Sequence, residues 1–309
     1  MNRGIIAASR LRASPGLILD SFSNAAIALS LRKLRAAYTG SCVKVRRSSD
    51  DTELDIGFID NELDILSLET FAGAGDAFVS ILYDQSTEGN NASQTTNNLQ
   101  PKIVDSGSVI LENGKPVIYF NGGKNLLVFN DVQAPTLFQD MSDAISLLIV
   151  EKRDVKGSAG RNWYNDITII ELRANSTSLG TGIPFSVGYS SSEFGFGVSD
   201  NYVSGSELSL GPSTDSTQRV SISIVNGDDL DADLNTVNSI NTTFSVATGD
   251  RSIGTANSTL SIGVRSRDGG QTNRSNYLGK IQEIILYKAN QTSNKSGLEN
   301  NINAYYSIY

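Results

Sequence analysis

A long succession of short β-strand patterns is the feature that most constrains how this chain folds. From Ala77 onward, segments rich in β-branched and aromatic residues alternate with clusters of Gly, Asn, Asp and Ser, which is typical of strands joined by tight turns. Glu112-Asn113-Gly114-Lys115 has the Asn-Gly pair of a two-residue hairpin, and Asn121-Gly122-Gly123 follows the next strand pattern. This texture predicts an all-β fold in which two sheets pack as a sandwich.

The clearest strand patterns are short and come at the spacing of a β-sandwich. They cover Ala77 to Tyr83, Val109 to Glu112, Pro116 to Phe120, Ala144 to Arg153, Asp166 to Leu172, Phe194 to Val198, Arg219 to Val225, Leu260 to Arg265 and Gly279 to Lys288.

Three helices are expected beside the sandwich, at about residues 24–38, 62–71 and 293–306, because apolar residues recur there every three or four positions. Asp60 or Asn61 is expected to begin the second of them. The chain shows no internal repeat of about 20 to 50 residues and no convincing linker. One domain is therefore expected.

The start of the chain and the remainder carry net charges of opposite sign. The 309 residues carry a net charge of -8, yet residues 1–47 hold nine basic side chains and one acidic one, which leaves -16 for the remainder. We therefore expect a basic N-terminal arm at residues 1–20 and a domain at residues 21–309. The arm could dock on the acidic surface of another copy; the alternative is a solvated helix face and a flexible end. The acidic total makes nucleic-acid binding unexpected.

Several kinds of site are excluded by composition. The chain has no His and a single Cys, Cys42, which excludes a Ser-His-Asp or Cys-His triad, a His-ligated zinc and an intramolecular disulfide. Catalysis would have to use carboxylates, Lys, Tyr or backbone groups. No apolar run reaches the roughly 18–20 residues of a membrane span. Arg10 and Arg12 interrupt the start of the chain, so no signal peptide is expected.

Two further patterns each allow two interpretations. An Asp-rich loop could hold calcium, but a solvated hairpin tip is favoured and no cofactor is expected; its residues are Asp228, Asp229, Asp231 and Asp233. Aromatic pairs could stack on sugar rings, but packing in the core or at its rim is favoured; these residues are Trp163 with Tyr164, and Tyr189 with Phe194 and Phe196.

The front part of the chain carries a series of distinctive motifs. In order, they are the segments Ile27 to Gly40 and Val43 to Asp50, then Ile56-Gly57-Phe58, Phe71-Ala72-Gly73-Ala74-Gly75-Asp76-Ala77-Phe78-Val79, Tyr83-Asp84-Gln85-Ser86, Gly89-Asn90-Asn91-Ala92 and Glu112-Asn113-Gly114-Lys115-Pro116. Over residues 20–123 this order resembles the α-L-arabinofuranosidase B catalytic-domain family. The segment Glu299 to Tyr306 resembles the family more weakly. Within the fifth and sixth motifs, we expect Asp84 and Asn90 to hold a tight loop through side chain to backbone hydrogen bonds.

The resemblance implies a concanavalin A-like jelly roll with a few short flanking helices. Enzymes of the family are secreted and remove arabinofuranose with a carboxylate nucleophile and a carboxylic acid. The position of the nucleophile matches Ser199, one residue before Asp200, and the acid should lie near Arg265 or Asp268. Because neither carboxyl is clearly carried over, no catalytic, cofactor-binding or metal-binding residue is assigned. Whether the chain is an enzyme stays open, and a role without catalysis is favoured.

The same front half occurs in structural proteins of tailed bacteriophages, which lack a secretory signal. The sequence is therefore interpreted as a virion protein: a head decoration, tail or fibre component. It would act by assembling with other virion proteins and with further copies of itself, and its jelly roll could face a host-surface glycan. Two alternatives remain open. One is an arabinofuranosidase-like glycoside hydrolase, and the other is a soluble lectin-like carbohydrate-binding module.

Overall fold

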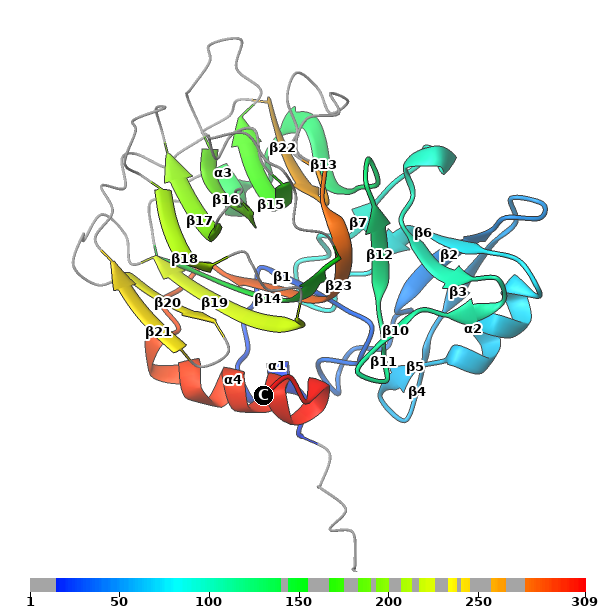
Figure 1. The fold of residues 1–309 in the computed structure, drawn as a ribbon, viewed down its shortest axis with the longest axis horizontal. Helices are drawn as coiled ribbons and strands as arrows, with labels where there is room; N and C mark the ends of the chain where they lie inside the picture. The colour runs from blue at the N-terminus through cyan, green and yellow to red at the C-terminus, as the bar shows by residue number, and fades with distance from the viewer. Residues whose placement is uncertain are drawn as a thin grey trace, which may run out of the picture.

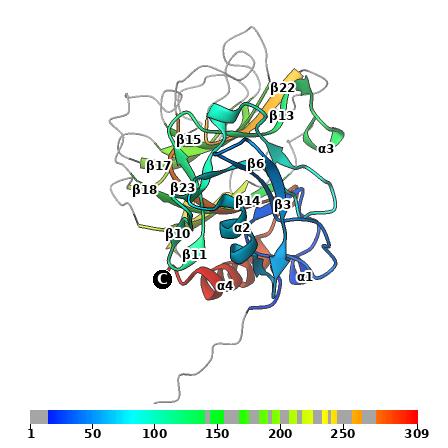
Figure 2. The ribbon, with the colours of Figure 1, turned by 90° about the vertical axis from the view of Figure 1, so that its right-hand side faces the viewer.

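Two layers of antiparallel strands face each other across an apolar core in a computed structural model of the chain (Figure 1). The structure describes residues 15–139, 144–154, 167–174, 183–189, 193–199, 207–212, 217–225, 233–237, 240–244, 257–264 and 276–309. The layers belong to one curled sheet, and an N-terminal lobe extends it (Figure 2). The predicted all-β sandwich is confirmed.

The first layer contains six strands, each antiparallel to its neighbours. In spatial order they are β13 (Leu126–Gln133), β22 (Asn257–Ile262), β15 (Ile167–Ala174), β16 (Ile183–Tyr189), β17 (Glu193–Ser199) and β18 (Glu207–Pro212).

The second layer is centred on β14 and β23. In spatial order its first five strands are β21 (Ile240–Phe244), β20 (Asp233–Val237), β19 (Arg219–Val225), β14 (Ile145–Arg153) and β23 (Leu278–Tyr287). On the side of β23 away from β14, two strands pair with different parts of β23: β1 (Ile27–Ser30) and β12 (Ile118–Asn121).

The N-terminal lobe is built from shorter strands and two small ribbons. Its strands are β2 (Val43–Arg47), β3 (Glu53–Ile56), β4 (Phe58–Ile59), β5 (Glu62–Leu63), β6 (Ala77–Leu82), β7 (Ala92–Ser93), β8 (Lys102–Asp105), β9 (Ser108–Val109), β10 (Leu111–Glu112) and β11 (Lys115–Pro116). The helices of the described chain are α1 (Ile18–Ser21), α2 (Ile65–Ala72), α3 (Thr136–Gln139), α4 (Lys295–Tyr306) and the 3-10 turns Asn97–Leu99 and Thr292–Asn294.

Two apolar clusters hold these parts together. The larger one fills the space between the layers, where Ile149 of β14 and Ile284 of β23 belong to the same cluster as Leu172 of β15. The smaller one lies on the other face of the second layer, where Leu298 and Ile302 of α4 pack with residues of β14, β19 and β23 (Figure 1). The second layer is thus buried on both faces, which explains its continuous runs of apolar residues.

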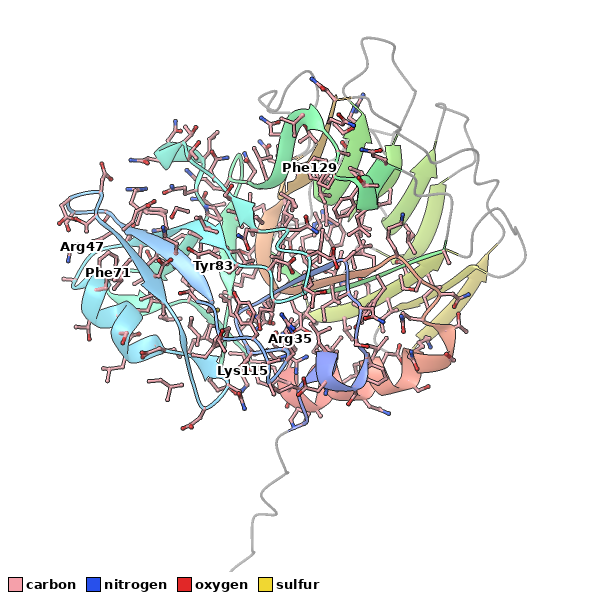
Figure 3. All side chains as sticks on the ribbon, turned by 180° about the vertical axis from the view of Figure 1, so that it is seen from behind. Arg35, Arg47, Phe71, Tyr83, Lys115 and Phe129 are labelled. Carbon is pink, nitrogen blue, oxygen red and sulfur yellow. The ribbon has the colours of Figure 1, made fainter. Side chains whose placement is uncertain are left out.

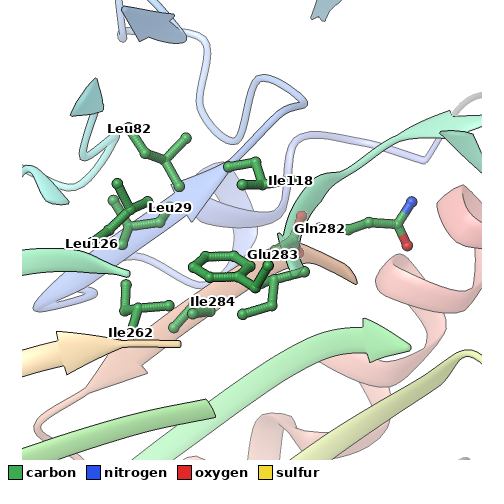
Figure 4. A pocket seen from close by; sticks show the side chains of 10 residues that line it. Leu29, Leu82, Ile118, Leu126, Ile262, Gln282, Glu283 and Ile284 are labelled. Atoms are coloured by element: carbon green, nitrogen blue, oxygen red, sulfur yellow. The ribbon is translucent and has the colours of Figure 1, made fainter. Parts of the chain in front are cut away.

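A void inside the larger cluster is lined by apolar side chains of both layers, among them Leu29, Ile118, Phe120 and Ile262 (Figure 4). Its volume is about 10 Å³. Ligand pockets typically measure about 300–1,000 Å³, and a single water already needs about 10–15 Å³. The void is therefore a packing defect rather than a binding site.

All nine predicted strand segments contain strands of the structure. The Asn-Gly hairpin is confirmed as well, because Asn113 and Gly114 have φ angles of 47° and 71° and Glu112 pairs with Lys115. The second and third predicted helices are confirmed as α2 and α4, although α2 begins after Asp64, whose carboxylate accepts from the Ser67 N–H.

The helix expected at residues 24–38 is wrong. Residues Ile27–Ser30 form β1, which pairs with β23 and is buried along its whole length. A strand buried on both faces shows a continuous apolar run, which short-range periodicity cannot distinguish from a helix. The Asp84 carboxylate also accepts a hydrogen bond from the Ala28 N–H at 2.7 Å, a contact 56 residues away along the chain.

Four of the six basic side chains that the structure describes between residues 15 and 47 form ion pairs within this chain. Arg32 pairs with Glu283, and three residues of β2 pair with acids near it: Lys44 with Asp55, Arg46 with Asp51 and Arg47 with Asp50. Arg47 also lies over the ring of Phe71 at the tip of the lobe (Figure 3). These four positive charges therefore contact acidic side chains of the same folded chain. Residues 1–14 of the expected arm lie outside the described residues, so docking by the arm stays a prediction.

Among the helices of the described residues, none is long and apolar enough to cross a membrane.

A pH-dependent contact joins the β10–β11 hairpin to the second layer. The Glu112 carboxylate accepts from Lys152 Nζ at 2.8 Å and from Lys280 Nζ at 3.0 Å. Burial by itself would raise the pKa of Glu112, but the two lysines outweigh it and hold the pKa below its ordinary value. A lowered carboxyl pKa adds stability above the unfolded-state pKa, and this stability is lost as the pH falls through the folded-state pKa.

Glu112→Gln is therefore expected to lower the free energy of unfolding by about 1 kcal/mol at neutral pH and by almost nothing below the folded-state pKa. Urea unfolding at both pH values measures this difference. Glu88→Gln, at an exposed carboxyl, is the control. An equal loss at both pH values would contradict the assigned ion pairs.

Candidate functional site

Two buried charges mark one face of the first layer. Glu171 and Arg173 of β15 alternate with Ile170 and Leu172, whose side chains belong to the core. Since successive residues of a strand point to opposite faces, Glu171 and Arg173 lie on the face turned away from that core. Glu171 is 2% exposed and Arg173 is 7% exposed. Burying charges in this way needs a reason, because such groups are seldom buried unless paired.

Polar cross-strand partners surround these two charges. Ser261 of β22 and Ser186 of β16 are the register partners of Glu171, and Thr259 of β22 is that of Arg173. Cross-strand partners share a face of the sheet. We call Glu171, Arg173, Ser186, Thr259 and Ser261 the polar face. Ser186 is only partly buried, so the polar face reaches solvent on its β16 side.

The hydrogen bonding of the polar face leaves one strong donor without an acceptor. Ser261 Oγ donates to the Val264 carbonyl at 2.8 Å, and the Thr259 hydroxyl lies 3.2 Å from Asn130 Oδ1. Within the described part of the chain, Nη1 of Arg173 is buried without a hydrogen-bond partner, and Arg173 makes no ion pair. A carboxylate, a guanidinium and hydroxyls on one face are the polar groups that orient a polyhydroxylated ligand.

A second charged cluster lies between the two layers. The Glu151 carboxylate accepts hydrogen bonds from the hydroxyls of Tyr189 and Tyr277, the latter at 2.6 Å, and lies 3.2 Å from Arg219 Nε. The Arg153 guanidinium lies 4.6 Å from the centre of the Tyr189 ring. Burial raises the pKa of Glu151, although Arg219 and the tyrosines oppose this shift. Burial, followed by the nearby Glu151, also raises the pKa of both tyrosines well above the ordinary value.

This Glu151 cluster has the composition of an active site but not the accessibility. Glu151, Tyr189 and Tyr277 are each at most 1% exposed. The cluster lies between the two layers and all of its members are buried, and it ties β14 to β16 and to Tyr277, just before β23. Glu171 is nearly as buried, but the polar face differs in reaching solvent at Ser186. Since Tyr189 lies in the core, the favoured interpretation of this aromatic residue as core packing is confirmed. The side chains of Phe194 and Phe196 are not described.

Other residues singled out from the sequence fall in different places. The Tyr83-Asp84-Gln85-Ser86 motif is structural, as expected: Asp84 accepts from the backbone N–H groups of Ser86 and Asn90, and Asn90 Nδ2 donates to the Ala26 carbonyl. Trp163, Tyr164 and most of the Asp-rich loop lie outside the described residues, and Asp233 is described only as the start of β20. Among the described residues, no three acidic or Cys side chains gather as a metal site.

The sequence places the catalytic carboxyls just after β17 and just after β22. These two strand ends lie beside opposite ends of the polar face. Ser199 ends β17, two residues after Gly197, the register partner of Ser186. Ser199 itself pairs with Ile183, at the start of β16. Gly263, in contrast, donates its N–H to Ile169, near the start of β15. The described backbone therefore does not bring these two strand ends together. Asp200, Arg265 and Asp268 lie outside the described residues.

The comparisons with known proteins find similarity to arabinofuranosidases. Residues 23–133 match the family model of the α-L-arabinofuranosidase B catalytic domain. An arabinofuranosidase solved with arabinofuranosyl-α-1,2-xylobiose shares the fold, with a TM-score of 0.66 and 17% identity over 94% of this chain and 64% of that one. An α-L-arabinofuranosidase of glycoside hydrolase family 54, solved with 4-nitrophenyl α-L-arabinofuranoside, gives a TM-score of 0.64 and 19% identity over 94% of this chain and 65% of its own.

A third structure, of a family 54 enzyme with a cyclic sulfate inhibitor, gives a TM-score of 0.62 and 18% identity over 94% of this chain and 65% of its own. The match thus covers slightly less than two thirds of the length of these solved chains. A search of curated proteins returns no match. The matches support the family resemblance inferred from the front motifs, and they confirm the jelly-roll-like sandwich.

The prediction of a virion structural protein is wrong. The matched model is that of a catalytic domain, and the solved structures that share the fold over 94% of this chain are arabinofuranosidases. These findings favour the alternative hypothesis of a glycoside hydrolase. The expectation of a virion protein rested on the resemblance to phage proteins and on the expectation that the chain has no signal peptide, and neither identifies a chemical activity.

Sequence reasoning missed the polar face. The pattern at Asp166 to Leu172 predicts the strand, but it does not by itself show that the Glu171 side chain is buried. The available signal was the alternation of Glu171 and Arg173 with Ile170 and Leu172, which is typical of a strand with one polar face. Ser186, Thr259 and Ser261 carry no such signal, because only the register brings them beside β15.

Proposed function

We propose that this chain is a glycoside hydrolase of the arabinofuranosidase type, with the polar face of the first layer as part of its sugar-binding surface. The observation that carries the proposal is the match of residues 23–133 to a catalytic-domain model, joined to a fold shared with arabinofuranosidases over 94% of the chain. The polar face adds support from the geometry, because Arg173 is buried there without an ion pair among the described residues, and an unpaired buried charge is costly.

Hydrolysis with retention would need two carboxyls about 5–5.5 Å apart, one ionised and one protonated. Asp200 and Asp268 are the carboxyls nearest the family positions in the sequence, and they are therefore the first two to test for these roles, each on its own. Glu171 has a different proposed role. Its carboxylate, which only accepts hydrogen bonds when ionised, would bind sugar hydroxyls and hold the ring against β15 and β22.

The test is release of 4-nitrophenol from 4-nitrophenyl α-L-arabinofuranoside by the full chain, with 4-nitrophenyl β-D-xylopyranoside as the comparison substrate. We expect release from the arabinofuranoside only, and loss of this activity in Asp200→Asn and Asp268→Asn. Asp60→Asn, at an exposed turn carboxyl of the lobe, should leave the activity unchanged. No release above the blank by the folded protein would overturn the proposed function.

Glu171→Gln is expected to lower kcat/KM for the arabinofuranoside by about tenfold to a hundredfold, the value of one hydrogen bond to a charged group. If Glu171 binds sugar in the ground state, most of the loss appears in KM. Steady-state kinetics of the variant beside the wild type measure this split. An unchanged kcat/KM would remove Glu171, and with it the polar face, from the proposed site.

A further inference from the structure

Arg173 differs from the other strongly buried arginines of the described chain in having neither an ion pair nor an aromatic ring contact there. Arg153 Nη2 and Arg219 Nε are also buried without a hydrogen-bond partner, but Arg153 lies over the Tyr189 ring. Arg32 pairs with Glu283, Arg46 donates to Gln100 and Asp51, and Arg219 pairs with Glu151. Arg173 is 7% exposed and makes no ion pair within the described residues, and its Nη1 has no hydrogen-bond partner there. An unsatisfied buried donor on a charged group is costly to the folded protein. At Arg153 and Arg219 a neighbouring ring or carboxylate offsets part of this cost, whereas Arg173 has no such neighbour within the described residues, so a ligand is the candidate partner.

The surroundings of Arg173 specify what this ligand must offer. Guanidinium has five N–H donors in a planar fork and no acceptor, which matches the two oxygens of a carboxylate. Glu171 lies two residues away on the same face, about 6.6 Å along the strand. It accepts hydrogen bonds and repels anions. The ligand must therefore present a carboxylate to Arg173 and hydroxyl groups to Glu171.

We propose that Arg173 and Glu171 form a binding site for a uronic acid residue, so that the chain acts on acidic polysaccharides. The carboxylate of the uronate pairs with Arg173, and ring hydroxyls donate to Glu171. Ser186, the partly exposed register partner of Glu171, marks the side from which the sugar approaches. The choice of a sugar rests on the proposed function, whereas the choice of an anionic group rests on Arg173 alone.

The experiment is isothermal titration calorimetry of the full-length protein with methyl β-D-glucuronide, and with methyl β-D-glucoside, which lacks the carboxylate. We expect the glucuronide to bind at least about tenfold more tightly than the glucoside. Arg173→Gln should abolish this preference, and Arg173→Lys should retain part of it. Lys44→Gln removes one positive charge from the N-terminal lobe and should leave both affinities unchanged.

Acetate and inorganic phosphate distinguish a uronate site from a simple anion site. We expect neither to displace the glucuronide, because neither presents ring hydroxyls to Glu171. Equal affinity for glucuronide and glucoside, or displacement of the glucuronide by acetate or phosphate at similar concentrations, would overturn the proposal. Since binding is measured without turnover, it stands or falls independently of nitrophenol release.

Thermal unfolding without ligand separates binding from a structural role. If Arg173 is held for a ligand, Arg173→Met should leave the melting temperature unchanged or raise it, because a buried charge without a partner is removed. Added glucuronide should raise the melting temperature of the wild type but not that of the variant. A large drop in the melting temperature of Arg173→Met would show that Arg173 supports the fold, and would overturn the proposal.

Discussion

Glu283→Ala is expected to lower the free energy of unfolding by about 3–5 kcal/mol, because it leaves a buried guanidinium without its carboxylate. Arg32 Nε and Nη2 donate to the two oxygens of Glu283 at 2.7 and 2.8 Å, and the side chains are 4% and 1% exposed. Ser30 Oγ and the Tyr306 hydroxyl donate to the same carboxylate at 2.9 and 3.0 Å. One side chain therefore joins the segment after β1 to β23 and to α4.

The charge of Arg32 cannot be relieved by deprotonation. Burial by itself would lower its pKa, but the ion pair with Glu283 outweighs burial and raises the pKa above its ordinary value. Equilibrium unfolding in guanidinium chloride measures the loss. The double variant Arg32→Met with Glu283→Leu removes both charges and should lose much less than the sum of the single variants. A loss below about 1 kcal/mol in Glu283→Ala would contradict this assignment.

Asp84→Ala is the second change with a large expected effect, about 3 kcal/mol or more, since several buried donors lose their common acceptor at once. Asp84 is 3% exposed. Its carboxylate accepts from the N–H groups of Ala28 at 2.7 Å, Ser86 at 2.9 Å and Asn90 at 2.7 Å, and from the Ser86 hydroxyl at 2.5 Å. These bonds fold the loop after β6 and attach it to β1.

Asp84→Asn tests whether the negative charge or only the shape is required. The amide keeps one acceptor oxygen and replaces the other by a donor, so we expect an intermediate loss. Glu88→Ala removes an exposed carboxyl from the same loop and should change the free energy of unfolding by less than about 0.5 kcal/mol. Denaturant unfolding compares the three variants. Equal stability of Asp84→Ala and Glu88→Ala would show that the loop is held by other contacts.

Turns and exposed helices of this protein were predictable because their signals are local. Asn113 and Gly114 adopt positive φ angles where the Asn-Gly pair predicts a two-residue hairpin. In α4, Leu298 and Ile302 recur at helical spacing and are buried against the second layer. The residues that specify these elements are consecutive or nearly so, and no distant partner is needed to interpret them.

Contacts with distant segments of the chain determine that β1 is a strand. Its partner β23 lies about 250 residues later, and the Asp84 carboxylate that accepts from Ala28 comes from a third segment. A short, mostly apolar run such as Ile27–Ser30 is compatible with both helix and strand, so tertiary pairing determines its conformation. The same holds for Arg32, which lies in the segment expected to form a helix at about residues 24–38, whereas the ion pair with Glu283 holds its side chain in the interior.

The candidate site, like β1, depends on contacts that only the tertiary structure shows. The sequence by itself determined the all-β class, the hairpin, the α4 helix and the family resemblance, because composition, turn residues and motifs are properties of contiguous segments. The polar face was decided by the tertiary structure alone. Glu171 meets Ser186 and Ser261, and Arg173 meets Thr259, only through the register of three strands that lie far apart in the chain. Register depends on how whole strands bury their apolar sides, and no single segment carries that information.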